Sequence, residues 1–271
     1  MKLTYENIND KIKEVLNGNK VDLSDVSHLD SWSLALVLSI LIEKQREAKK
    51  RLILPTNKDL LRYLKEIGFS EILDELNYKK EAKLLDGIEA TGQEDLNIKK
   101  ITHCRLRSHF DGKLSYFLET FREFGLKKID PERVTSLIGE LGNNSFDHNL
   151  GNWPTDFMGC LIIVKNYPKE KYVQVIVSDA GVGFLTSLLP AFPELKNDIE
   201  ALRKGLRGNT GRVGEKRGNG LKVIQDWTIK NFSGKVSIQS GEGLIEVDKN
   251  GMHEEKCNKI LGTIAQLTLH Y

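Results

Sequence analysis

The sequence predicts an α+β fold, in which a small N-terminal α/β unit precedes a larger domain with helices on one face of a mixed sheet. Two observations support this prediction. Residues 21–64 alternate short β-rich runs with helical runs, and residues 101–271 combine longer helical runs with β-rich runs that gather toward the end. A polar, charged stretch over 77–100, with room for one short helix, separates the two parts. We therefore expect domains over 1–76 and 101–271 joined by a linker.

The N-terminal unit is expected to run strand, helix, strand, helix. These elements cover Val21–Val26, Ser33–Lys50, Arg51–Leu54 and a last helix that carries Leu60, Leu61 and Leu64. Thr56 and Asp59 form a pattern similar to a capping box at the start of the last helix, and Gly68 ends that helix. The crossovers between such strands are expected to be right-handed.

Three pieces of this unit resemble the STAS domain, the fold of anti-sigma-factor antagonists. They are V-D-L-S-D-V from Val21, L-D-S from Leu29 and L-L-R-Y-L-K-E-I-G-F from Leu60, and the resemblance covers roughly residues 5–75. The family usually reads D-S-S-G where this chain has Asp30-Ser31-Trp32-Ser33, so Trp32 stands in place of the serine that is phosphorylated in the antagonists. The resemblance therefore implies a docking or scaffold role, and Ser31 and Ser33 are expected to cap the next helix.

The larger domain is expected to centre on a helix over Asp130–His148. Asp130 suits the N-cap and Pro131 the first helical position. At helical spacing Val134, Leu137, Ile138 and Leu141 share one face, and Glu140, Asn144, Asp147 and His148 lie on its flank. An ordinary amphipathic helix with a solvated edge is the alternative interpretation of this stretch alone. The other expected elements are strands over Ile101–Arg107, Cys160–Val164, Tyr172–Ser178, Lys235–Gln239, Leu244–Val247 and Thr263–Leu269, and helices over Leu114–Phe124 and Gly220–Asn231.

Two glycine motifs follow that helix in the chain. D-x-G-x-G begins at Asp179, at the end of a predicted strand, where a carboxylate can accept a hydrogen bond from an exocyclic amine. Gly181 and Gly183 would let the backbone approach a flat ring without a Cβ clash. G-x-G at Gly218 and Gly220 precedes a helix, whose free N–H groups favour phosphate.

The helix itself carries E-x-x-x-N at Glu140 and Asn144. An asparagine oxygen is a suitable ligand for Mg²⁺, which leaves its remaining positions to water and phosphate. A glutamate one turn earlier is placed to polarise a water molecule beside that metal. The motif therefore predicts a metal site next to a general base.

Together these motifs resemble the GHKL superfamily of ATPases, which includes gyrase, MutL, histidine kinases and anti-sigma-factor kinases. The resemblance covers about Ile101–Tyr271 and implies a Bergerat-type α/β sandwich, with ATP and Mg²⁺ as cofactors. It implies that Glu140 is the general base, that Asn144 holds Mg²⁺, and that Asp179 and Thr263 bind adenine. The other implied nucleotide-binding residues are Asp147, His148, Gly181, Gly183, Gly218, Gly220 and Leu221.

By the same resemblance, Leu185–Arg217 corresponds to the lid over the nucleotide. This segment shows little hydrophobic periodicity except around Ile199–Leu206, and its end is rich in glycine and basic residues. We expect it to order only when Mg-nucleotide is bound, because the anion would offset the charge repulsion and chain entropy. A nucleic-acid patch is the other interpretation, disfavoured because no aromatic residue is interleaved for base stacking.

Composition and charge argue against several other classes of protein. The formal net charge of +2 is too small to imply nucleic-acid or membrane binding by itself. Leu34–Ile42, the longest nearly apolar run, is too short to span a bilayer, and the N-terminus lacks the apolar region of a signal peptide. Cys104, Cys160 and Cys257 are far apart and odd in number, which favours neither a disulfide framework nor a zinc cluster. A cytoplasmic location is expected.

The expected function is that of an ATP-binding regulatory protein with slow, Mg²⁺-dependent ATP hydrolysis, whose lid controls a protein partner or a homodimer. A serine kinase of the anti-sigma-factor type is one alternative, and a nucleotide sensor without hydrolysis is another. A sensor histidine kinase is disfavoured. His109 precedes Glu140 by too few residues for the dimerising hairpin that such kinases carry.

Overall fold

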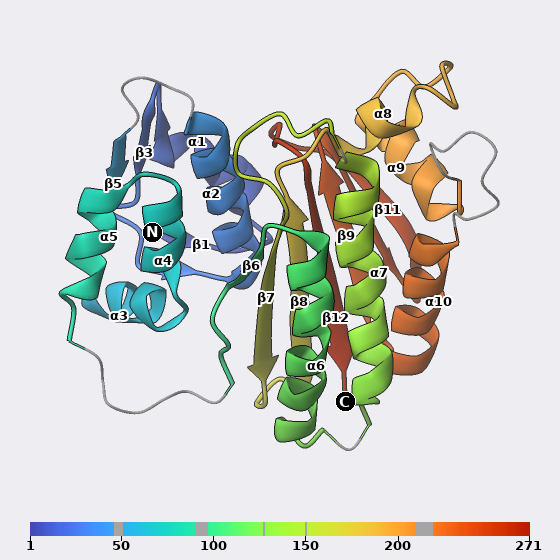
Figure 1. Ribbon diagram of the computed structural model, residues 1–271, viewed down its shortest axis with the longest axis horizontal. Helices are drawn as coiled ribbons and strands as arrows, with labels where there is room; N and C mark the ends of the chain where they lie inside the picture. The colour runs from blue at the N-terminus through green and yellow to red at the C-terminus, as the bar shows by residue number, and fades with distance from the viewer. Residues whose placement is uncertain (46–50, 90–96, 127, 150, 210–218) are drawn as a thin grey trace.

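The computed structural model describes residues 1–45, 51–89, 97–126, 128–149, 151–209 and 219–271. Its centre is a large sheet with helices packed on both faces (Figure 1). The N-terminal part of the chain covers one face, and helices of the C-terminal part cover the other. The fold is therefore α+β, as the sequence predicts.

The N-terminal part contains two small sheets and short helices. Its elements are β1 (Lys2–Leu3), α1 (Ile8–Val15), β2 (Leu16–Asn17), β3 (Lys20–Asp22), β4 (His28–Leu29), α2 (Ser31–Lys44), β5 (Arg51–Ile53), α3 (Lys58–Glu66), α4 (Phe69–Glu75) and α5 (Lys79–Asp86). Strands β3 and β5 pair in parallel on either side of α2 in the chain, which matches the predicted strand–helix–strand–helix order. Helix α5 lies in the stretch predicted as a linker and packs against α3 and α4.

The C-terminal part builds the large sheet. Its elements are β6 (Thr102–Cys104), α6 (Arg107–Glu123), α7 (Pro131–Asn149), β7 (Cys160–Tyr167), β8 (Tyr172–Asp179), α8 (Gly183–Leu188), α9 (Asp198–Leu206), α10 (Gly220–Phe232), β9 (Lys235–Ser240), β10 (Gly243–Asp248), β11 (Gly251–Lys256) and β12 (Thr263–His270). The strand order is β11-β10-β9-β12-β8-β7-β6, and each described pairing is antiparallel. The prediction of a mixed sheet is therefore wrong. Short turns join β7 to β8, β9 to β10 and β10 to β11, and a short turn reverses the chain, so that these neighbouring strands are antiparallel.

Helices α6, α7 and α10 cover one face of the large sheet (Figure 1). The predicted apolar stripe of α7 is buried, and it shares one hydrophobic core with alternate residues of the strands beneath it. Those strand residues include Ile162, Val164, Val173, Val175, Leu267 and Leu269. Burial of this stripe leaves the polar flank of α7 at the end of the sheet.

Helix α2 covers the opposite face, which the sequence-based prediction left bare. Each residue from Ser31 to Ile42 is buried, so this part of the helix has no solvent face. The core around it also contains Leu161, Ile163 and Ile176 of the large sheet, and Ser39 Oγ donates a hydrogen bond of 3.0 Å to the Leu261 carbonyl. The N-terminal part and the large sheet therefore share a continuous hydrophobic core.

Two helix starts differ from the sequence-based expectation. Asp30, and not Ser31 or Ser33, caps α2, since its carboxylate accepts the Ser33 N–H at 2.8 Å. Asn57 caps α3 through its side-chain oxygen, whereas the Thr56 hydroxyl bonds to a backbone carbonyl elsewhere. In each case a carboxylate or amide oxygen takes the N-cap, where its reach satisfies a free N–H of the first turn.

Three further elements lie where no helix or strand was predicted. Strand β11 is the edge of the large sheet, and almost all of its residues are exposed, so its sequence shows no apolar alternation. Helix α9 lies within Leu185–Arg217, the segment expected to be a lid, and α8 begins at Gly183, just before it. Across the described ranges, no helix combines the length and apolar character that crossing a membrane requires.

Candidate functional site

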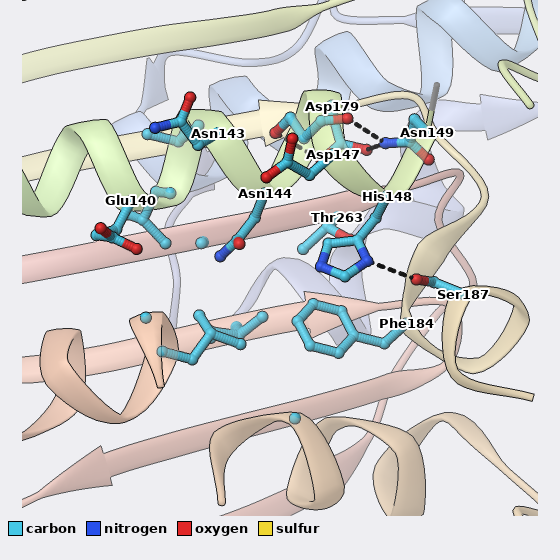
Figure 2. A pocket seen from close by; sticks show the side chains of 18 of the residues that line it. Glu140, Asn143, Asn144, Asp147, His148, Asn149, Asp179, Phe184, Ser187 and Thr263 are labelled. Carbon is cyan, nitrogen blue, oxygen red and sulfur yellow. Dashed lines mark hydrogen bonds between the residues drawn. The ribbon is translucent and has the colours of Figure 1, made fainter. Parts of the chain in front are cut away.

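A cavity of about 700 Å³ opens at the C-terminal end of α7. Its walls come from α7, the ends of β8 and β12, α8 and the start of α10 (Figure 2). The predicted residues that line it are Glu140, Asn144, Asp147, His148, Asp179, Gly183, Gly220, Leu221 and Thr263. Gly181 lies just behind this lining, and Gly218 lies outside the described residues. Residues far apart in the sequence thus meet around one space.

Asp179 presents a carboxylate that is surrounded by neutral donors. Its Oδ1 accepts hydrogen bonds from the Gly181 N–H at 2.9 Å and from Asn149 Nδ2 at 3.2 Å, and its Oδ2 accepts from Ser145 Oγ at 3.0 Å. Burial raises the pKa of Asp179 from 3.8 to about 6, while these donors oppose the rise. The group is therefore mainly ionised at neutral pH, and its free lone pairs can accept an N–H from a ligand.

Asn149 joins α7 to the turn after β8. This buried side chain donates to Asp179 Oδ1 and to the Ser145 carbonyl, and its Oδ1 accepts the Val182 N–H at 2.8 Å. A Cβ on Gly181 would lie 2.0 Å from Asn149 Nδ2. Glycine at this position therefore lets the turn approach α7 closely enough for the bonds to Asp179 and Val182.

Ser240 connects the two loops on the other side of the aspartate. Its Oγ accepts the Phe184 N–H at 2.9 Å and donates to the Gly262 carbonyl at 3.0 Å. Gly183 and Gly262 have left-handed φ angles of +77° and +73°, and a Cβ on Gly183 would lie 2.8 Å from Ser240 Oγ. Thr263, the predicted adenine contact, pairs directly with Asp179 in the sheet register. Ser240 thus links the start of α8 to the loop that carries this threonine.

The other end of the cavity lies where α7 faces the start of α10. A Cβ on Gly220 would lie 2.5 Å from Glu140 Oε2, so the glycine leaves space for this carboxylate. Asn144 lies one turn further along α7 and lines the same cavity (Figure 2). Helix α10 has no side-chain cap, and the free N–H groups of a helix start attract anions. This end therefore combines a carboxylate, an amide and a helix N-terminus.

Two of the predicted site residues are paired with side chains that were not predicted to belong to the site. Asp147 forms an ion pair with Arg107 at the start of α6. His148 Nδ1 lies 2.9 Å from Ser187 Oγ of α8, a hydrogen bond that Figure 2 shows across the cavity. Arg107 and Ser187 both line the cavity, so α6 and α8 are tied to the flank of α7.

The predicted site residues did not include Ser145, Asn149 or Ser240. Ser145 and Asn149 are four residues apart on α7, and this spacing places them on the same helix face toward Asp179. That spacing was a usable signal. Ser240 directly follows the strand predicted over Lys235–Gln239, and no local pattern marks it, since its partners come from distant loops.

No protein-family model matches the chain, and no curated protein matches it. Within the residues that the structure describes, no cluster of three or more His, Cys, Asp or Glu side chains is suited to hold a metal. The chemistry of the site is therefore inferred from the side chains that line the cavity.

Proposed function

We propose that this protein binds ATP with Mg²⁺ in the cavity, hydrolyses it slowly and uses the bound nucleotide to regulate a protein partner. The observation that carries the proposal is the Asp179 carboxylate, buried among neutral donors at one end of a cavity whose other end carries a helix N-terminus. A buried carboxylate with neutral neighbours suits an amine donor such as the exocyclic amine of adenine. An uncapped helix start suits phosphate.

The dimensions of the cavity fit an elongated ligand. From Glu140 to Asn149, which bonds to Asp179, α7 rises roughly 14 Å. The cavity volume of about 700 Å³ lies within the usual range for small-molecule sites. A nucleotide with its base at Asp179 and its phosphates at Gly220 would follow α7.

The residues at the phosphate end fit a magnesium ion that the nucleotide brings with it. Asn144 offers a neutral oxygen, and Mg²⁺ bound to nucleotide typically takes few protein ligands, so the lack of an acidic cluster is compatible with it. When bound, the ion would neutralise charge on the phosphates. Glu140 is partly free to reach a water molecule, because its side chain is exposed to the cavity.

The motif resemblance supports the same assignment. Glu140, Asn144, Asp179, Gly183 and Thr263 match GHKL positions and line one cavity. The layer of α6, α7 and α10 on the large sheet supports a Bergerat-type sandwich for the C-terminal part. We extend the proposal to the N-terminal part of the chain, to which we assign a STAS-like scaffold role. The parallel pairing of β3 and β5 around α2 supports this assignment.

Calorimetry with MgATP tests the proposed site directly. Asp179→Asn replaces one acceptor oxygen by a donor, and we expect it to weaken binding by about 1.5–3 kcal/mol, or roughly 10- to 150-fold. Asn143→Ala is a matched control, because Asn143 also lines the cavity from α7 but lies away from Asp179. Equal affinity of wild type and Asp179→Asn would exclude Asp179 as the adenine contact.

The alternative of a serine kinase that acts on its own N-terminal part is disfavoured by one observation. Ser31 and Ser33 are buried, with exposures of 1% and 0%, so neither hydroxyl is presented to a kinase. Incubation with γ-labelled ATP separates the functions. Free phosphate that is lost in Glu140→Ala indicates an ATPase, label on protein indicates a kinase, and binding without either product indicates a sensor. Glu132→Ala, on α7 outside the cavity, is the control.

A further inference from the structure

Two cysteines lie side by side near the edge of the large sheet, and neither lines the cavity, although Cys160 is also the register partner of Asp179. Cys104 of β6 and Cys160 of β7 are direct partners in the antiparallel register, and both are fully buried as free thiols. Directly opposed residues of an antiparallel pair have Cα atoms roughly 4.5–5.5 Å apart, which lies inside the range that a disulfide spans. The backbone therefore already holds this pair at bonding distance.

The backbones of the two strands touch at this point. Gly159, just before Cys160, has a left-handed φ of +92°, and a Cβ there would lie 1.9 Å from the Cys104 carbonyl oxygen. Only glycine allows this approach. The register of the two cysteines is thus fixed by a contact next to them, and a one-residue slip would be sterically blocked.

The two thiols differ in acidity. A hydrogen bond from Cys160 lowers the pKa of Cys104, and the charge of Lys113 on α6 lowers it further against the effect of burial. The hydrogen bond to Cys104 raises the pKa of Cys160, as do burial and the negative charge of Asp179. Because a positive charge acts on Cys104 and a negative charge acts on Cys160, Cys104 is the thiol that loses its proton first. This asymmetry is typical of a nucleophilic and a resolving cysteine.

We propose that Cys104 and Cys160 are an oxidative modification site that closes to an intrachain disulfide with a peroxide as the oxidant. The Cys104 thiolate attacks one oxygen of hydrogen peroxide, the O–O bond breaks, and the departing hydroxide takes a proton to form water. Cys104 then carries a sulfenic acid. The Cys160 sulfur attacks Cys104 Sγ, the S–O bond breaks, and hydroxide leaves with the Cys160 proton as a second water. Two electrons pass from the sulfurs to the peroxide.

Burial determines which oxidant suits the site. Neither thiol is exposed, so a small peroxide reaches the pair more readily than a bulky disulfide. Strand β6 is short and pairs only with β7 in the described sheet, so local opening of this edge disrupts few hydrogen bonds.

Thiol mapping on the intact, folded chain tests the proposal. The protein is treated with hydrogen peroxide, unfolded in excess iodoacetamide, and analysed by peptide mass spectrometry with and without dithiothreitol. We expect two of the chain's three cysteines, Cys104 and Cys160, to become unreactive and joined in one cross-linked peptide pair. Dithiothreitol should restore both. Cys257→Ser should behave as wild type, because burial raises the pKa of Cys257 to about 12 and keeps that thiol protonated.

Cys160→Ser supplies the second arm, because it removes the resolving thiol and keeps a hydroxyl of similar size. In this variant we expect the sulfenic acid at Cys104 to persist, trapped by dimedone, with no intrachain cross-link. The proposal is overturned if wild type keeps three alkylatable thiols at peroxide concentrations that oxidise a surface methionine such as Met252. It is also overturned if the only disulfide formed contains Cys257. No nucleotide is used, so the result does not depend on the proposed function.

Discussion

Asn149 Nδ2 donates a hydrogen bond of 3.2 Å to Asp179 Oδ1, while Asn149 Oδ1 accepts the backbone N–H of Val182. One amide therefore fixes both the carboxylate at the floor of the cavity and the turn that follows it. The orientation of the amide is set by this pair of contacts, since the carboxylate can only accept and the N–H can only donate. Asn149 is a positioning residue for the candidate adenine contact.

Asn149→Ala should weaken both folding and nucleotide binding. The change leaves the Val182 N–H without its acceptor and leaves Asp179 Oδ1 with the Gly181 N–H but one donor fewer, which costs about 1–3 kcal/mol of unfolding free energy. Urea denaturation measures that loss, and calorimetry measures the affinity for MgATP. Asn143→Ala, on the same helix, should change the unfolding free energy by less than about 0.5 kcal/mol. Equal stability of the two variants would remove the role assigned to Asn149.

Asp179→Asn should stabilise the free protein at neutral pH. The folded-state pKa of Asp179 is raised from 3.8 to about 6, so the folded protein binds the proton more tightly than the unfolded chain. The wild type is therefore favoured at low pH and loses stability as the pH rises through about 6. Asparagine does not titrate and keeps the donors satisfied by rotation of the Ser145 hydroxyl.

The stability difference between Asp179→Asn and wild type should thus be small near pH 4, grow as the pH rises to about 6, and stay level at higher pH. A gain of up to roughly 2 kcal/mol is expected, because cavity solvent screens part of the effect. Thermal melts from pH 4 to pH 8 measure it. A difference that stays constant across this window would show that Asp179 has an ordinary pKa in the folded state.

Gly220→Ala should slow the proposed hydrolysis without unfolding the protein. The new Cβ would lie 2.5 Å from Glu140 Oε2, and the flexible glutamate side chain can turn away at low cost. Displacing the general base should lower kcat by about 10- to 100-fold. Gly139→Ala is the control, because its Cβ would meet only Leu114 Cδ1 at 4.0 Å.

The control variant Gly139→Ala should keep full activity and gain about 0.5–1 kcal/mol of stability from its helical position. Steady-state phosphate release and thermal melts check both variants. A normal rate in Gly220→Ala would mean that the present position of Glu140 is not the one used in hydrolysis.

Trypsin should distinguish the ordered part of the expected lid from its basic end. Arg203 and Lys204 lie in α9, where Arg203 Nε bonds to Glu254 Oε1 at 2.8 Å and Lys204 pairs with Glu194. We expect no early cleavage at either residue, with or without MgATP. Arg212, Lys216 and Arg217 lie outside the described residues, and their glycine-rich sequence predicts cleavage that MgATP suppresses and Mg²⁺ alone does not.

Mass spectrometry of the first tryptic fragments separates these sites. Early cleavage at Arg203 in the free protein would mean that α9 also orders only when nucleotide is bound. Cleavage at Arg212 that is equal in both conditions would contradict coupling between the nucleotide and this segment.

The sequence predicted the helical scaffold of the site better than its polar contacts. Helix α7 begins at Pro131, as the Asp130–Pro131 pair indicated, and its apolar stripe is buried. These features follow from local spacing and capping. The contacts of Ser240 with Phe184 and Gly262 depend on three separate chain segments, so no local pattern could reveal them.

The sheet was harder to predict than the helices. Strand β11 is exposed on both faces and therefore lacks the alternation by which strands are recognised. Whether two strands of the large sheet run parallel or antiparallel depends on which strands become neighbours. Strand β12, the last in the chain, lies between β8 and β9. Long-range pairing of this kind leaves no mark in the spacing of residues.

The burial of α2 has a consequence for how the chain can be divided. A helix without a solvent face from Ser31 to Ile42 cannot be assigned to one half of the molecule, because its removal would bare Leu161, Ile163 and Ile176 to water. A C-terminal fragment that begins at the polar stretch before β6 would expose an apolar face of the large sheet and would tend to aggregate. The polar stretch in the sequence therefore does not separate two independent cores in the folded molecule. The two parts should unfold in a single cooperative thermal transition.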